Sequence, residues 1–367
     1  MHIVLLLTSF AVILAGAFLF TNAVEWMGHR MSLGVGAVGS ILAAVGTAMP
    51  ETLIPIVAII GGAEGAEDVA IGAIVGAPFL LATIAMALVG ISALAYVKRR
   101  PQGRRLNAHL PTLERDLTFF AVFFALGLAL GQGAPTSVQI PAALACFFAY
   151  LVYARWTVMH SGDTQDEGSI DPLIMSRGMG LRGSEAAGAA AAEPAGPAGD
   201  AAAGPVAVGP GGPVAVGPAV PPFGLIIIQM LIGLGAMIAG AHLFVHELLW
   251  VAEELGASAL VLSLVLAPLA TELPEKANSF FWVREGKDSL ALGNITGAMV
   301  FQSTIPIGIG LAFTEWELTA FANVSVLLGL AGGGVAYLAL HRQARFSLPA
   351  IAAWALLYIA FLVVVVI

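Results

Sequence analysis

The sequence predicts an all-α membrane protein with ten transmembrane helices in two inverted five-helix repeats. Three observations predict it: an extreme apolar composition, ten apolar segments of membrane-spanning length, and a resemblance between the two halves. Of the 367 residues, 59% are hydrophobic and only 10% are charged, and the mean hydropathy is +0.93. Soluble domains carry roughly 25% charged residues. This composition excludes a water-soluble globule, and a pI near 5.3 without a basic stripe excludes a nucleic-acid-binding protein.

A helix needs roughly 20 mostly apolar residues to cross the hydrocarbon core of a bilayer. Ten segments of the chain approach this requirement, although the fourth is short. They are approximately 2–24, 33–61, 69–97, 117–131, 136–158, 223–250, 257–283, 288–313, 317–341 and 346–367.

The composition changes between the fifth and sixth segments. Residues 160–221 are rich in Gly, Ala and Pro and contain a near-tandem repeat, Gly204–Pro210 and Gly212–Pro218. Such a segment buries too little apolar surface to offset the entropy of ordering. We therefore expect a disordered linker that separates a first five-helix half, 1–159, from a second, 222–367.

The distribution of Lys and Arg predicts the orientation in the membrane. Fourteen of the fifteen basic residues follow or end odd-numbered spans, and the even-to-odd connections contain none. Cytoplasmic loops are enriched in Lys and Arg. The sequence thus predicts an integral protein of the plasma (inner) membrane, surrounded by lipid bilayer, with an external N-terminus and a cytoplasmic linker. The remaining basic residue, Lys276, lies inside the seventh span.

The two halves resemble each other at a constant offset. Ala15–Phe20 aligns with Ala239–Phe244, and the same offset of 224 pairs Glu51 with Glu275. Each half contains an odd number of spans, so the two copies must be inverted relative to each other. Inverted repeats with interrupted helices are typical of secondary transporters, whose binding sites lie at the repeat interface.

Spans two and seven each carry the pattern Thr-x-x-Pro-Glu, at Thr47–Glu51 and Thr271–Glu275. A carboxylate deep in a span is expensive and indicates function by default. Each proline lacks an N–H and frees the carbonyl four residues earlier, which belongs to Gly46 or Ala270. Carboxylate, hydroxyl and carbonyl oxygens are the ligands that Ca²⁺ and Na⁺ prefer. The paired patterns therefore predict a cation site.

These motifs resemble the Ca²⁺/cation antiporter superfamily of the sodium/calcium exchanger type. Its two α-repeats carry G-T-S-x-P-E on one helix and G-N-x-x-G-S-N-x-x-N on the next. Here the repeats span about 33–97 and 257–313, and their second motifs are Gly72–Leu81 and Gly293–Gln302. The resemblance implies a cation site whose central ligands are Glu51 and Glu275, assisted by Thr47 and Thr271.

The chain departs from the family pattern at several positions. The family serines are replaced by Ala48, Glu272, Ala77 and Ala298, and the last ligand position is Leu81 in one repeat and Gln302 in the other. Fewer side-chain oxygens remain for sodium. A proton needs only one carboxylate, so proton coupling is at least as strongly favoured as sodium coupling.

The second repeat also contains charges of its own, Glu272, Glu275 and Lys276, with Asn278 one turn further on. Glu272 and Lys276 form an i,i+4 pair in the favourable order. Lys276 either neutralises Glu272 as a buried pair, or it places an ammonium group where relatives hold a cation. In the second interpretation Lys276 takes part in coupling or proton exchange.

The sequence thus favours a secondary cation antiporter that works by alternating access and exchanges Ca²⁺ or another cation for H⁺ or Na⁺. Its partners would be inorganic cations, with no nucleic acid and no cofactor beyond the transported ions. The alternative is a non-transporting membrane sensor or scaffold that retains the same fold. No nucleophile–base pair or metal triad is apparent, so we do not expect an enzyme.

Overall fold

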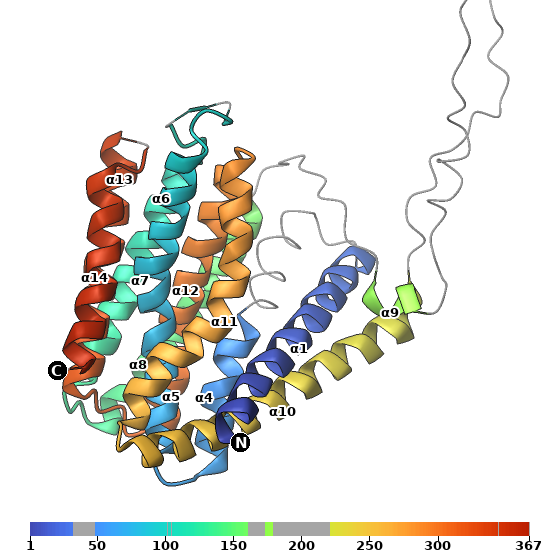
Figure 1. Ribbon diagram of the computed structural model, residues 1–367, viewed down its shortest axis with the longest axis vertical. Coiled ribbons are helices and arrows are strands. Elements are labelled where there is room, and N and C mark those ends of the chain that lie inside the picture. The colour runs from blue at the N-terminus through green and yellow to red at the C-terminus, as the bar shows by residue number, and fades with distance from the viewer. Residues whose placement is uncertain are drawn as a thin grey trace, which may run out of the picture.

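The computed structural model describes residues 1–31, 48–100, 102–103, 105–160, 173–178, 221–343 and 345–366. All regular structure in these residues is helical (Figure 1). The helices are α1 (His2–Arg30), α4 (Met49–Gly61), α5 (Ala66–Leu80), α6 (Met86–Ala95), α7 (Leu110–Leu130), α8 (Thr136–His160), α9 (Ile174–Gly178), α10 (Phe223–Leu255), α11 (Ala259–Arg284), α12 (Asp288–Phe313), α13 (Ala320–Gln343) and α14 (Leu348–Val366).

Seven helices in the described part of the chain are long and apolar enough to cross a membrane, and two shorter apolar helices accompany them, Met49–Gly61 and Ala259–Glu272. The predicted all-helical membrane class is therefore confirmed, whereas ten spans in an inverted repeat remain a prediction. Of the expected span 33–61, only the part from residue 48 onward is described.

Some element boundaries differ from the expected ones for clear reasons. The helix α12 coincides with the expected segment 288–313, but α10 continues to Leu255, five residues beyond the expected end. It ends where Gly256 adopts a left-handed conformation with φ of 61°. The helix α7 begins at Leu110, seven residues before the expected start, because its charged first turns are helical as well.

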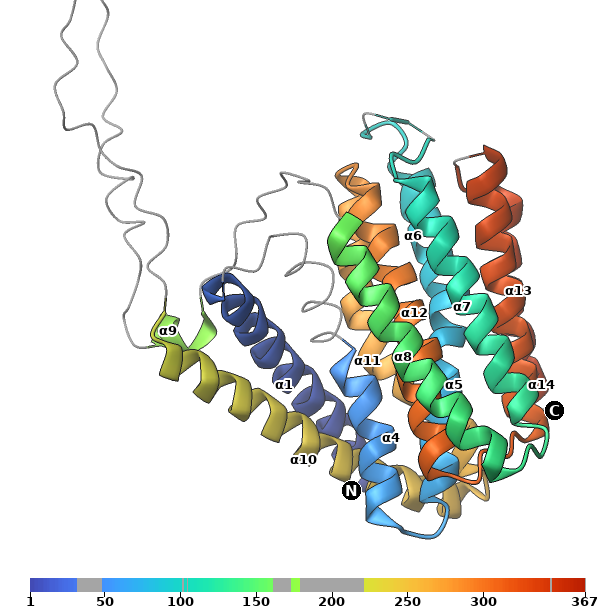
Figure 2. The same ribbon diagram turned by 180° about the vertical axis from the view of Figure 1, so that it is seen from behind.

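Two views show a bundle with a slanted helix pair beside it (Figures 1 and 2). The pair consists of α1 and α10, which pack along each other and meet the rest mainly where α10 contacts α4. Gly233 allows the close approach, because a Cβ atom there would lie 2.7 Å from the backbone nitrogen of Phe20. Small residues at such crossings are typical of membrane helices.

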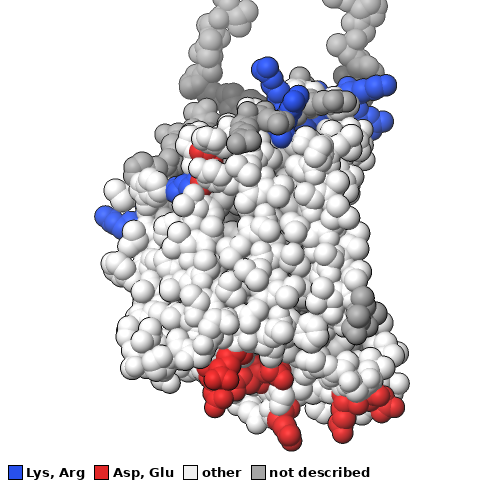
Figure 3. Space-filling view, turned by 90° about the vertical axis from the view of Figure 1, so that its left-hand side faces the viewer, with Lys and Arg blue, Asp and Glu red and all other residues white. Residues whose placement is uncertain are grey.

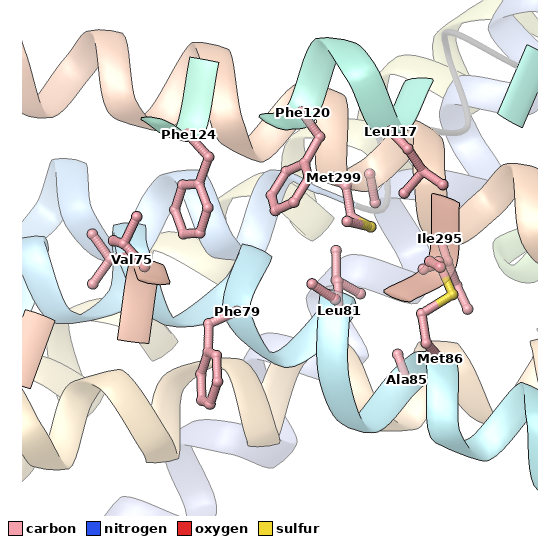
Figure 4. Packing of buried hydrophobic residues seen from close by; sticks show 14 of the residues in the cluster. Val75, Phe79, Leu81, Ala85, Met86, Leu117, Phe120, Phe124, Ile295 and Met299 are labelled. Carbon is pink, nitrogen blue, oxygen red and sulfur yellow. The ribbon is translucent and has the colours of Figure 1, made fainter. Parts of the chain in front are cut away.

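The largest hydrophobic core lies inside the bundle. Buried side chains from α5, α6, α7 and α12 interlock there, among them Phe79, Phe120 and Met299 (Figure 4). A π-helical turn, η2 (Leu81–Ala85), separates α5 from α6, shortly after Pro78 removes an N–H from the helix. The Thr83 hydroxyl donates a hydrogen bond of 2.7 Å to the Phe79 carbonyl in this turn.

The helices α5 and α11 come from different halves of the chain and lie in close contact. A Cβ atom at Gly76 would clash with the carbonyl oxygen of Leu264, so only glycine fits. The Ser263 hydroxyl adds a hydrogen bond of 2.7 Å to the Val69 carbonyl. This contact fixes the position of α11, which carries the second Thr-x-x-Pro-Glu pattern.

Charged side chains separate along the long axis of the molecule. On the face that Figure 3 shows, Lys and Arg lie in the upper part, and the lower end carries only Asp and Glu. At the basic end, Arg100 Nη2 lies 2.5 Å from Asp288 Oδ2, with both side chains fully buried. This ion pair joins the connection after α6 to the start of α12.

Most of the expected linker 160–221 falls outside the described residues. The structure departs from the expectation of a disordered segment at 173–178, where the chain forms α9 beside α1 and α10 (Figure 1). Leu173, directly before α9, is completely buried. The linker therefore contains at least one segment with a defined place on the helices.

Candidate cation site

The carboxylate of Glu51 is placed by the first turn of α4. Pro50 lies in the same turn, where a missing N–H costs nothing because no helical partner exists there. Glu51 is only 4% exposed. Ala48, directly before the helix, shares a buried cluster with Tyr150 of α8 and Phe301 of α12. The start of α4 thus lies against the part of α12 that carries Gln302.

A second buried carboxylate, Glu272, connects the two motif helices of the second repeat. Its Oε1 accepts a hydrogen bond from Nε2 of Gln302, so α11 and α12 meet through these two side chains. Glu272 is 1% exposed and Gln302 is completely buried. Oε1 of Gln302 is also buried and has no hydrogen-bond partner within the described part of the chain. An amide oxygen in this situation is suited to a hard cation.

Lys276 lies one turn after Glu272 on α11. Its Nζ is 3.4 Å from Oε2 of Glu272 and donates a hydrogen bond of 2.9 Å to Oδ1 of Asn294 on α12. Lys276 is only 1% exposed. The structure therefore forms the predicted i,i+4 pair and extends it into a chain of four side chains: the buried Gln302, Glu272 and Lys276, and the partly buried Asn294.

The other predicted ligands differ in how far the structure describes them. Thr271 is buried, and its hydroxyl donates a 3.0 Å hydrogen bond to the Ala267 carbonyl, which leaves its oxygen available as an acceptor. Ala270 is a partly buried residue of α11. Gly46 and Thr47 lie outside the described residues, and so do the side chains of Glu275 and Asn278.

A further buried acid, Asp116 of α7, holds α12 from the opposite side. Its Oδ2 accepts a 2.9 Å hydrogen bond from Thr296, and its Oδ1 accepts from Tyr153 at 3.0 Å and from Arg115 at 2.7 Å. The motif residue Thr296 thus fixes α12 against α7 and α8. Asp116 was not among the site residues predicted from the sequence, although a carboxylate beside an apolar run was a usable signal.

The described residues supply mixed oxygen donors. Among the described side chains, no group of three or more His, Cys, Asp or Glu residues is arranged to hold a metal ion. Carboxylates Glu51 and Glu272 and the amide oxygen of Gln302 come from α4, α11 and α12, which contact one another. Such donors suit Ca²⁺ and Na⁺ better than softer metals, which prefer nitrogen and sulfur.

Comparison with known families agrees with this chemistry. The family model described as sodium/calcium exchanger protein matches residues 1–159 and 225–367, which is most of the chain. The chain belongs to this family. The resemblance read from the motifs is therefore confirmed, and the protein has the fold of the cation/Ca²⁺ exchangers. This family and the two relatives described next are named as exchangers or antiporters, so the prediction that the protein is not an enzyme is confirmed too.

The relatives share short matching regions with this exchanger-family protein. An Alkalimonas amylolytica protein named as an antiporter, CaxA, is 33% identical over 95 residues, which are 26% of this chain and 30% of that protein. The sodium/calcium exchanger MaX1 of Methanosarcina acetivorans is 28% identical over 107 residues, 28% of this chain and 31% of that protein. These matches thus span about a third of each relative.

Two solved structures share the fold across nearly the entire chain. The crystal structure of the H⁺/Ca²⁺ exchanger CAX has a TM-score of 0.68 at 18% identity and covers 99% of this chain and 82% of that one. The sodium–calcium exchanger NCX_Mj has a TM-score of 0.56 at 16% identity and covers 99% and 97%. The fold is thus that of integral membrane exchangers of inorganic cations.

Proposed function

We propose that this protein is a secondary active cation antiporter that works by alternating access and holds its cation between the paired intramembrane glutamates Glu51 and Glu275. The observation that carries this proposal is the buried contact between Glu272 and Gln302, because it joins the two motif helices at a position where the family has a ligand. A carboxylate inside a membrane protein is expensive and marks an ion pathway by default.

The proposed ligand set combines side-chain and main-chain oxygens. Each Thr-x-x-Pro-Glu pattern would supply a carboxylate, a hydroxyl and a main-chain carbonyl. The second repeat would add an amide oxygen and one further carboxylate. The set is Glu51, Glu275, Thr47, Thr271, the carbonyls of Gly46 and Ala270, Gln302 and Glu272.

We propose the ten-helix inverted architecture as the frame of this site. Residues 1–159 and 222–367 would be the two five-helix halves, with α-repeats at about 33–97 and 257–313. The linker 160–221 would be cytoplasmic and the N-terminus external, in the plasma membrane. The separation of basic from acidic side chains along the molecule supports this orientation (Figure 3).

The charge of the site supports a divalent cargo. Three glutamates, Glu51, Glu272 and Glu275, and one lysine, Lys276, leave a net charge of −2. Lys276 contacts Glu272, so it would offset that carboxylate and leave the paired glutamates to balance one Ca²⁺ or two monovalent ions. Asn278, on the next turn, would take part in the coupling.

The exchanged ion would be H⁺ or Na⁺. The solved relatives are named as a proton/calcium exchanger and a sodium–calcium exchanger, so the fold accommodates both. In this chain, four positions that carry oxygen ligands in the family pattern are apolar and packed in the interior: Ala48, Ala77, Leu81 and Ala298. Their burial favours the proton, which needs fewer protein oxygens.

The same four positions support a second candidate function. A chain that lost ligand oxygens and filled their places with packed apolar side chains could keep the exchanger fold as a non-transporting sensor or scaffold. The two Thr-x-x-Pro-Glu patterns and the buried polar chain at Glu272 favour transport instead, because a scaffold has no use for expensive intramembrane charges.

Cation flux in proteoliposomes distinguishes these functions. We expect an imposed gradient of H⁺ or Na⁺ to drive Ca²⁺ or another cation across the membrane in the opposite direction. Glu51→Gln should lower the apparent affinity for a divalent cation by about tenfold or more, because affinity for hard cations follows ligand charge. The matched control is Glu64→Gln, at an exposed residue of the turn after α4. Unchanged flux in Glu51→Gln would overturn the proposed site, and a correctly inserted protein without any cation flux would favour the scaffold.

A further inference from the structure

A short piece of the linker is packed onto the slanted pair of α1 and α10. Leu173 is completely buried in a cluster with Ala23 and Trp26 of α1 and Ile226 of α10. The following residues form α9, which lies beside the last turns of α1 and the first turns of α10 (Figures 1 and 2). This segment therefore contacts both halves of the protein.

Two buried amide side chains receive the main chain of this segment. Oδ1 of Asn22, on α1, accepts a 3.0 Å hydrogen bond from the N–H of Ile174, and Oε1 of Gln229, on α10, accepts one of 2.9 Å from the N–H of Met175. Gln229 is completely buried and Asn22 is 7% exposed. Both acceptors thus face the linker from within the helix pair.

The two amides are also bonded to each other and to the backbone. Nε2 of Gln229 donates to Oδ1 of Asn22 and to the carbonyl of Leu19, both at 2.9 Å. These bonds fix the orientation of the Gln229 amide, so that its oxygen points to the linker. Because a buried amide oxygen without a donor is costly, the Gln229 oxygen is placed to receive an N–H group from the linker.

The second end of the linker is held close to the same place. Nη1 of Arg30, at the end of α1, donates a 3.0 Å hydrogen bond to the carbonyl of Pro221, directly before α10. The guanidinium group also lies over the Phe223 ring at 5.7 Å. The linker residues between 178 and 221 therefore connect two points on one helix pair.

We propose that Asn22 and Gln229 form a binding site for peptide main chain, and that residues 173–176 are its built-in ligand. The site recognises backbone N–H groups, with Leu173 as an apolar side-chain anchor. It cross-links a first-half helix to a second-half helix through the linker. This inference does not depend on which ions the protein transports.

Hydrogen–deuterium exchange on the full chain in lipid nanodiscs tests the site. We expect exchange at Ile174 and Met175, whose N–H groups donate to the two amides, to be slowed by about tenfold or more, which corresponds to about 1.4 kcal/mol, the contribution of one or two net hydrogen bonds. A short synthetic peptide with the sequence of residues 173–178 provides the reference rates. Equal exchange rates in the protein and in the peptide would overturn the proposal.

Two variants separate main-chain recognition from side-chain packing. Ile174→Pro removes the N–H donor at the first position of α9, where a helix tolerates proline, and should abolish the slowing at Met175. The matched control Ile174→Ala keeps the N–H and should keep the slowing. Gln229→Leu should have the same effect as Ile174→Pro from the other side of the contact. Slowed exchange that persists in Ile174→Pro would refute main-chain recognition even if Gln229→Leu fails to fold.

Discussion

The buried ion pair between Lys276 and Glu272 provides a quantitative test of how the candidate site holds its charges. Nζ lies 3.4 Å from Oε2, and the two side chains are only 1% and 2% exposed. We predict that Lys276→Met strongly destabilises the protein and abolishes transport. The double variant Glu272→Gln/Lys276→Met should recover much of the stability, because it removes the pair without leaving a charge behind.

The expected magnitude follows from the geometry of the pair. Two unit charges 3.4 Å apart attract by about 5 kcal/mol at an effective dielectric constant near 20. Loss of one partner from a buried pair costs about 3–5 kcal/mol, since the remaining charge is uncompensated. Lys276→Met also removes the 2.9 Å hydrogen bond to Asn294, and a Gln at position 272 keeps an oxygen for Gln302. We expect a coupling energy of about 3 kcal/mol between positions 272 and 276.

The assay is an unfolding titration in mixed detergent micelles for the wild type, both single variants and the double variant. The matched control is Lys287 with Glu285, which have the same side-chain types 3.0 Å apart but are 50% and 55% exposed. Their coupling should stay below about 1 kcal/mol. Effects at 272 and 276 that add within about 0.5 kcal/mol would refute the ion-pair reasoning. A stable double variant without flux would instead assign Lys276 or Glu272 a direct part in coupling.

Three further predictions follow from other contacts. Arg100→Met should destabilise the protein by about 3–5 kcal/mol in the same titration, because it leaves the fully buried Asp288, whose Oδ2 lies 2.5 Å from Arg100 Nη2, without its partner. The added change Asp288→Asn should recover part of this loss, and stability effects of the two changes that simply add would contradict the prediction. Deletion of 183–218 should leave flux within about twofold of the wild type, since loop length changes closure entropy by only about 0.6 kcal/mol per doubling; complete loss in a correctly inserted protein would assign that segment a function. A pH gradient without sodium should drive cation efflux from proteoliposomes. Efflux that responds to a sodium gradient but not to a pH gradient would exclude proton coupling.

The sequence contained enough information to predict the class of fold and the family, because both depend on local patterns. Apolar runs of membrane-spanning length need no tertiary contact to be recognised, and α12 has the bounds that its composition predicted. The Thr-x-x-Pro-Glu patterns are equally local. Their repetition at a fixed offset identified Glu51, which the structure buries at the start of α4.

The contacts of the site were less predictable, because their partners are far apart in the chain. The pairing of Glu272 with Lys276 is a helical i,i+4 contact and follows from spacing. The bond from Lys276 to Asn294 crosses between helices, and the one from Thr296 to Asp116 joins residues 180 positions apart. The helical start of α7 was missed for the same reason, since charged residues before an apolar run resemble a loop until their partners are known.

Several buried polar contacts join a helix of the first half of the sequence to a helix of the second half. Arg100 with Asp288, Asp116 with Thr296, and Asn22 with Gln229 each join residues 1–159 to residues 222–367. Moving the two halves as rigid bodies would break all three contacts, and a buried charge left without its partner costs about 3–5 kcal/mol. A cycle that repeatedly passes through such a state would be slow. The proposed alternating access is therefore easier to reconcile with units built from both halves, such as α1 with α10 and α12 with α7 and α8. In that arrangement a cation bound between the α4 and α11 carboxylates would lie where such units meet.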